Sequence, residues 1–143
     1  MPSAQRSVRI GRPVSEVFAF FADPANEPKW RGSHLKEFTP QGPIAVGTRI
    51  RQVVAGPMGR GLDADIEITD LQPEARYAFK GVAGPLRPLG EYTFRPVEDG
   101  TEVTFRLDAP LAGLKKVFMG NSVQKAMNAE MAALDTAKAV LEA

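Results

Sequence analysis

The sequence predicts an α+β domain in which a long C-terminal helix covers one face of an antiparallel sheet. Three observations lead to this class. Apolar residues recur at helical spacing over residues 13–22, alternate with polar residues over residues 33–109, and return to helical spacing over residues 121–142. Because the sheet and the last helix would each have a single apolar face, we expect the two to cover each other.

The first predicted elements are a short strand over residues 7–10 and an amphipathic helix over residues 13–22. Residues 7–10 alternate between polar and apolar, as in a strand. The helix is indicated by four apolar residues at helical spacing, Val14, Val17, Phe18 and Phe21. We expect Pro13 at its first position, where the missing N–H of proline has no helical partner.

A second short helix is predicted directly after the first. Asp23 precedes Pro24, and the residue before a proline is pushed out of the helical region, so the first helix should end there. Pro24 is expected to open the second helix, Pro28 to limit it to about one or two turns, and Trp30 to close the segment.

The predicted sheet contains about seven antiparallel strands. Clear alternation marks residues 49–54, 62–69, 77–81, 92–95 and 103–108, separated by turn-forming pairs such as Gly56-Pro57 and Asp99-Gly100. Each strand has one apolar face, which indicates a sheet with one face in water. A sheet of this size twists and curls, so its interior need not close fully against one helix.

The last predicted element is a helix over residues 121–142, lying across the concave face of the sheet. Its apolar stripe consists of Val123, Met127, Met131, Leu134 and Leu141. We therefore expect Met127 and Leu134 to be buried. Gly120 is expected to mark either the start of this helix or a kink.

Composition excludes several classes of function. The chain has 143 residues, as expected for one domain, and its net charge of +1 gives no general attraction to nucleic acid or to anionic membrane. Since it has no Cys and one His, we expect no metal and no redox cofactor. No apolar segment approaches the roughly 20 residues of a membrane span, and no signal peptide is evident, so we expect a cytoplasmic protein. The oligomeric state stays open.

Four segments resemble a known family. They are residues 14–24 (VSEVFAFFADP), 26–30 (NEPKW), 46–49 (VGTR) and 99–103 (DGTEV). Together they resemble the START-like superfamily, also called SRPBCC, and within it the polyketide cyclase/dehydrase branch. The resemblance covers nearly the whole chain and implies a helix-grip fold. It also implies a cavity between the sheet and the long helix that binds an apolar or aromatic small molecule.

Aromatic and methionine side chains are the candidate ligand-binding residues. Parity places one set on the inner face of the sheet: Ile66, Tyr77, Phe79, Tyr92, Phe94 and Phe105. The facing side of the long helix offers Met119, Val123 and Met127, and methionine adapts to irregular space. The resemblance adds Trp30 near the cavity mouth. For every one of these residues the alternative is a place in the ordinary hydrophobic core.

The charged candidates are fewer. His34 is expected to be exposed or to cap an element, because the sequence shows no partner for it; the alternative is a general acid or base. Strict alternation turns Glu91 toward solvent, and only a bulge would make it a buried base. Lys115, Lys116 and Lys125 are expected on a solvated face, the alternative being attraction of an anionic ligand or headgroup.

The expected function is the binding of a hydrophobic or aromatic small molecule, lipid- or polyketide-like, in the cavity. The alternatives are a cyclase or dehydratase that uses acid/base chemistry in the same cavity, and a module that binds an apolar segment of a partner protein. A buried ionisable group inside the cavity would favour the enzyme, whereas a closed apolar cavity would favour a carrier. A large exposed apolar patch would favour the partner module.

Overall fold

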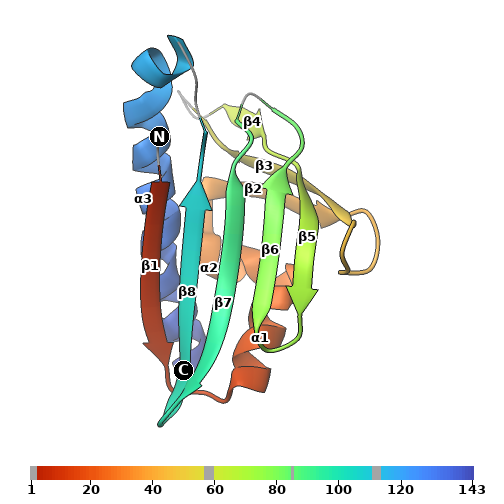
Figure 1. The fold of residues 1–143 in the computed structure, drawn as a ribbon, viewed down its shortest axis with the longest axis vertical. Helices are drawn as coiled ribbons and strands as arrows, with labels where there is room; N and C mark the ends of the chain where they lie inside the picture. Colours follow the sequence, from red (N-terminus) through yellow and green to blue (C-terminus); the bar gives the residue numbers. More distant parts are fainter. Residues whose placement is uncertain (1–2, 57–59, 85, 111–113) are drawn as a thin grey trace.

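An antiparallel sheet curls around the long C-terminal helix, which confirms the predicted α+β helix-grip fold (Figure 1). The computed structural model describes residues 3–56, 60–84, 86–110 and 114–143; the side chains of Ser33 and of residues 114–122 lie outside this description. The strands within the described residues are β1 Ser3–Ile10, β2 Leu35–Pro40, β3 Arg49–Ala55, β4 Gly61–Asp63, β5 Ile66–Gln72, β6 Arg76–Gly81, β7 Leu89–Val97 and β8 Gly100–Asp108. Their order is β1-β8-β7-β6-β5-β3-β2, and the short β4 pairs with β3.

The helices differ from the prediction at their ends. They are α1 Val14–Ala22, α2 Glu27–Arg31 and α3 Leu114–Glu142, with short 3₁₀ turns at Pro24–Asn26 and Gly32–His34. Pro13 has an extended ψ of 150° and precedes α1 instead of beginning it. Pro28 was expected to limit the second helix, but it lies in the first turn of α2, where the missing N–H of proline costs no hydrogen bond.

α3 is longer than predicted, because it begins at Leu114 and not at residue 121. Gly120 therefore lies within the helix and does not start it. One glycine costs a helix only about 1 kcal/mol relative to alanine, which does not outweigh the packing of so long an element. The predicted burial is confirmed, since Met127 is 6% exposed and Leu134 is fully buried.

The register of three neighbouring strands builds an aromatic row on the inner face of the sheet. Tyr77 of β6 pairs with Tyr92 of β7, and Tyr92 pairs with Phe105 of β8. Ala78 pairs with Glu91 on the opposite, outer face, so no bulge reverses β7 at this point. The alternation in the sequence therefore predicted the correct face for both tyrosines.

The α-helices of the described residues lie on the inner side of the sheet (Figure 1). α3 runs along β1, while α1 packs against β7 and β8 and α2 packs against α3. The short α2 thus lies between the curled β2–β3 end of the sheet and the long helix, which brings its side chains to the end of the interior space. No helix within the described ranges is long and apolar enough to cross a membrane.

Candidate functional site

A cavity of about 130 Å³ lies between the inner face of the sheet, α2 and α3. The structure places these predicted residues in its wall: Ile66, Tyr77, Phe79, Tyr92, Phe105, Val123 and Met127. Their contact with a ligand stays a prediction. Half-buried Leu62 of β4, half-buried Leu86 and Pro88, and the exposed Ala126 of α3 also line the cavity.

Stacked rings form the sheet side of the cavity. Tyr92 and Phe105 lie 4.2 Å apart between ring centroids with their planes 6° apart, and Tyr77 meets Tyr92 edge to face at 5.9 Å. Phe79 pairs with Gly90, and a Cβ on Gly90 would lie only 2.2 Å from the Phe79 ring. The absence of a side chain at Gly90 is thus what allows the Phe79 ring to lie against β7.

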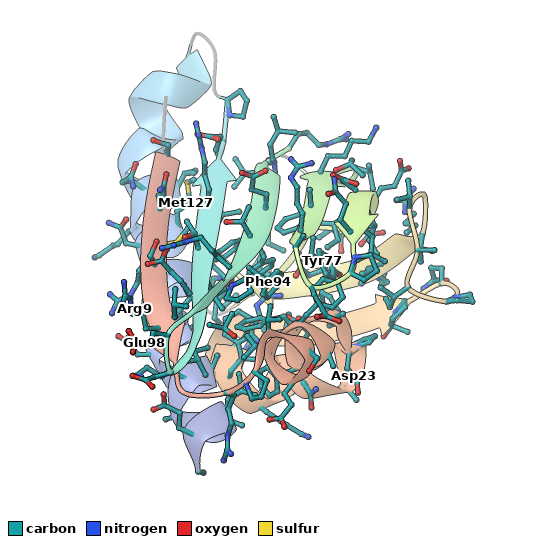
Figure 2. All side chains as sticks on the ribbon, turned by 60° about the horizontal axis from the view of Figure 1, so that its bottom comes forward. Arg9, Asp23, Tyr77, Phe94, Glu98 and Met127 are labelled. Carbon is teal, nitrogen blue, oxygen red and sulfur yellow. The ribbon has the colours of Figure 1, made fainter. Side chains whose placement is uncertain are left out.

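Two of the candidate ligand contacts, Trp30 and Phe94, do not line the cavity, because their side chains pack in the core. Trp30 is 2% exposed and packs edge to face on Phe21 at 5.3 Å, away from the cavity wall. Phe94 packs edge to face on Phe18 at 5.1 Å. In both cases α1 covers the inner face at this point; Figure 2 shows Phe94 among the crowded interior side chains above the coil of α1. Met119 lies outside the described side chains.

The polar end of the cavity is a buried cluster that the sequence prediction missed. Arg31 of α2 donates from one terminal nitrogen to Glu27 Oε2 at 3.2 Å and to Gln52 Oε1 at 2.7 Å, and from the other to Glu130 Oε1 at 2.9 Å. The amide of Gln52 is oriented by its own donation to the Ala64 carbonyl at 2.9 Å. The side chains of Glu27, Arg31 and Glu130 are only 7%, 9% and 11% exposed.

His34 belongs to the same cluster, which corrects the expectation that it is exposed or caps an element. Its Nε2 lies 2.7 Å from Glu130 Oε1, and its ring is half-buried in the cavity wall. This contact orients the imidazole ring, and a proton held on Nε2 leaves Nδ1 as the nitrogen that can accept one.

Two signals in the sequence could have found this cluster. Glu27 and Arg31 are spaced i,i+4 on one helix, and Glu130 falls at helical spacing from Val123 and Met127, within the apolar stripe of α3. A carboxylate inside an apolar stripe needs a buried partner, and Arg31 is that partner.

The two carboxylates have opposite pKa shifts. Burial raises the pKa of Glu27 to about 7, although the charge of Arg31 opposes the shift. Burial would also raise the pKa of Glu130, but Arg31 and the hydrogen bond from His34 outweigh it and lower that pKa to about 2. Burial raises the pKa of Tyr92 well above its ordinary value, so its hydroxyl keeps its proton.

Glu91 and Lys125, two other charged candidates, lie outside the cavity. Glu91 accepts from Arg76 Nε at 3.0 Å on the outer face of the sheet, as strict alternation predicted. Lys125 is exposed, while the side chains of Lys115 and Lys116 lie outside the description. Within the described residues no group of three or more carboxylate or imidazole side chains could hold a metal ion.

A curled antiparallel sheet that encloses an apolar cavity against a C-terminal helix defines a START-like helix-grip protein. The chain belongs to the family described as polyketide cyclase / dehydrase and lipid transport, whose profile matches residues 1–142. Membership of this family supports the interpretation that the fold is one that binds hydrophobic ligands. No curated protein matches the sequence.

Solved structures share the fold at low sequence identity. A protein from Thermus thermophilus superposes with a TM-score of 0.78 at 21% identity, covering 96% of this chain and 94% of its own. A START superfamily protein from Mycobacterium smegmatis gives 0.75 at 13% identity, with coverage of 98% and 97%. The di-domain ARO/CYC protein BexL of the BE-7585A biosynthetic pathway gives 0.80 at 21% identity; the match covers 99% of this chain and half of BexL.

Proposed function

We propose that the protein binds a hydrophobic or aromatic small molecule, lipid- or polyketide-like, in the cavity between the sheet and α3. The observation that carries this proposal is the aromatic row of Tyr77, Tyr92 and Phe105 facing Met127 across an open space of about 130 Å³. An apolar cavity of about 150 Å³ holds a benzene ring, so a single aromatic ring matches the observed space. Larger ligands require Met127 to change rotamer, which its flexible side chain allows.

Two methionines on α3 provide a matched test. Met127 lines the cavity, whereas Met131, one turn further on, is buried in the core. We expect Met131→Ala to lower the free energy of unfolding by about 2–5 kcal/mol, as for other buried methionines, and Met127→Ala to lower it by less, because its side chain already borders open space. Urea denaturation of both variants measures the difference.

Ligand binding is measured on the same two variants with a neutral fluorescent probe, N-phenyl-1-naphthylamine. We expect Met127→Ala to change the affinity of the probe and Met131→Ala to leave it nearly unchanged, since only the first substitution enlarges the cavity. Equal losses of stability in the two variants, together with unchanged probe affinity, would mean that Met127 is a core residue and that the proposed cavity is not a binding site.

A second candidate function is acid/base catalysis on a carbonyl substrate of the cyclase or dehydratase type. It is favoured by the contact of His34 with Glu130 in the cavity wall at 2.7 Å. A carboxylate that accepts from one imidazole nitrogen orients the ring and leaves the other nitrogen free to remove a proton next to a carbonyl group. Glu27, with its pKa raised to about 7 by burial, carries a proton near neutrality and suits the part of the acid.

Deuterium exchange tests this candidate. We expect the protein to accelerate exchange at the carbon next to the carbonyl of phenylacetone in D₂O, and His34→Ala to lower the accelerated rate by about 10²–10⁴-fold. Proton NMR follows the exchange, and affinity for the fluorescent probe shows that the variant still binds. If His34→Ala exchanges as fast as the parent protein, or the parent gives no acceleration, the protein is a binding protein without this chemistry.

A further inference from the structure

With Glu27 ionised, the polar end of the cavity carries two carboxylates against one guanidinium. Glu27 and Glu130, here called the carboxylate pair, share the single guanidinium of Arg31. Three of the five N–H groups of that guanidinium donate, to both carboxylates and to Gln52, and His34 Nε2 lies 2.7 Å from Glu130 Oε1. The Nε of Arg31 has no partner but is fully enclosed, so an anionic ligand arriving here would meet two carboxylates before it reached a free donor.

Each member of the carboxylate pair also has an oxygen to spare. Among the described residues, Glu27 Oε1 and Glu130 Oε2 make no hydrogen bond, although both side chains are about nine-tenths buried and line the cavity. Among the described residues, two side-chain nitrogen atoms are fully enclosed and have no hydrogen-bond partner: Trp30 Nε1 and Arg31 Nε. No side-chain oxygen atom of these residues is in that position. The two carboxylate oxygens therefore border open space, where they can accept hydrogen bonds from a ligand.

We propose that this end of the cavity binds the protonated amine of an otherwise apolar, aromatic ligand and discriminates against a carboxylate in the same position. The inference rests on the proposed function, and it specifies the ligand class. An ammonium group offers three donors to the free oxygens and balances the excess negative charge. A neutral hydroxyl offers one donor and no charge, so the affinity of such a ligand should lie between those of the amine and the acid.

Binding of an amine is expected to displace a proton from Glu27. Burial raises the pKa of this carboxyl to about 7, so near neutrality a large share of it is protonated. The groups that face it are Arg31 on its own helix, Glu130 on α3, and the hydroxyls of Tyr77 and Tyr92 on the sheet. A ligand ammonium takes the place of that proton, whereas a neutral alcohol does not.

Three ligands with the same ring and the same two methylenes test the proposal: 2-phenylethylamine, 2-phenylethanol and 3-phenylpropionate. Their single ring matches the cavity volume of about 130 Å³. We expect the amine to displace the neutral fluorescent probe at least about tenfold more tightly than the acid, with the alcohol in between. Calorimetry in two buffers of different ionisation enthalpy should show proton release for the amine and none for the alcohol.

Substitutions in the carboxylate pair test where the preference for the amine arises. Glu27→Gln and Glu130→Gln each remove one charge with little change of shape, and each should reduce the ratio of amine to acid affinity about tenfold. Either variant suffices if the other does not fold. Glu37→Gln, on the exposed edge strand β2, is the control and should keep the ratio of the parent protein.

The outcomes separate this inference from the proposed function. If the probe binds but the acid binds as tightly as the amine, or none of the three ligands competes, the charge preference is wrong and the hydrophobic site stands. If neither the probe nor, by calorimetry, any of the three single-ring ligands binds, both proposals fail. A preference for the amine that survives both glutamine substitutions would also overturn the inference, because the attraction would then arise elsewhere.

Discussion

Replacement of Arg31 by methionine is expected to lower the free energy of unfolding by about 3–5 kcal/mol near pH 8, the cost of leaving buried carboxylates without their partner. Arg31 is 9% exposed and connects α2 to Glu130 of α3 and to Gln52 of β3. Without it, Glu27 and Glu130 face each other in the interior. Since protonation relieves that repulsion, the loss should shrink as the pH falls, and urea denaturation at several pH values measures it.

Arg76 provides the matched control. It also holds two carboxylates, Asp70 and Glu91, but it does so on the outer face of the sheet with a side chain that is 39% exposed. Exposed ion pairs contribute about 0–1 kcal/mol, so Arg76→Met should cost far less than Arg31→Met. Comparable losses in the two variants would show that burial of the Arg31 cluster adds nothing to its strength.

Much of the fold could be predicted from the sequence because the relevant information is local. Alternation along one strand fixes which side chains share a face, and it placed Tyr77 and Tyr92 inside and Glu91 outside. The stripe on the last helix predicted the burial of Met127 and Leu134 in the same way. The element ends were less predictable, since the start of α3 depends on packing that the local pattern does not contain.

The site was harder to predict because its contacts join distant parts of the chain. Parity assigns Phe94 and Tyr92 to one face, but it does not say that α1 covers Phe94 and leaves Tyr92 at the cavity. The pairing of His34 with Glu130 requires α2 to pack against α3, which no short segment indicates. For the same reason Glu27 and Arg31 could be taken for an ordinary surface pair of a short helix.

The buried cluster is also relevant to the choice between the two candidate functions. Buried ion pairs often stabilise a fold no better than apolar side chains of similar volume. Stability of the fold alone therefore does not account for Glu27, Arg31 and Glu130, whereas the ligand contacts proposed above would. Both a carrier that orients a polar end group and an enzyme that moves a proton would use them, and His34→Ala distinguishes the two, because only the enzyme depends on its basic nitrogen.

Glu27→Gln is expected to reveal a pH dependence of stability that burial of Glu27 imposes on the parent protein. The ordinary pKa of the group is 4.5, and in the folded protein burial raises it to about 7. The folded state therefore holds the proton more tightly than the unfolded state does. This contribution to stability is fully present below about pH 4.5, declines as the pH rises, and is lost once the pH passes about 7. The loss amounts to about 3 kcal/mol at 1.4 kcal/mol per pKa unit.

Glutamine imitates the protonated carboxyl at every pH, so the variant should escape this loss. We expect the stability of Glu27→Gln relative to the parent to rise by about 2.5 kcal/mol between pH 5 and pH 8, measured by urea denaturation. The pKa of Glu130 is shifted in the opposite direction, to about 2, so its contribution is lost only as the pH falls below about 4.5, outside this window. Glu37→Gln, at an exposed position, should differ from the parent by a constant amount. If the difference for Glu27→Gln is equally constant, Glu27 is ionised in the folded protein throughout this range, and neither proton release by an amine nor the role of Glu27 as an acid can stand.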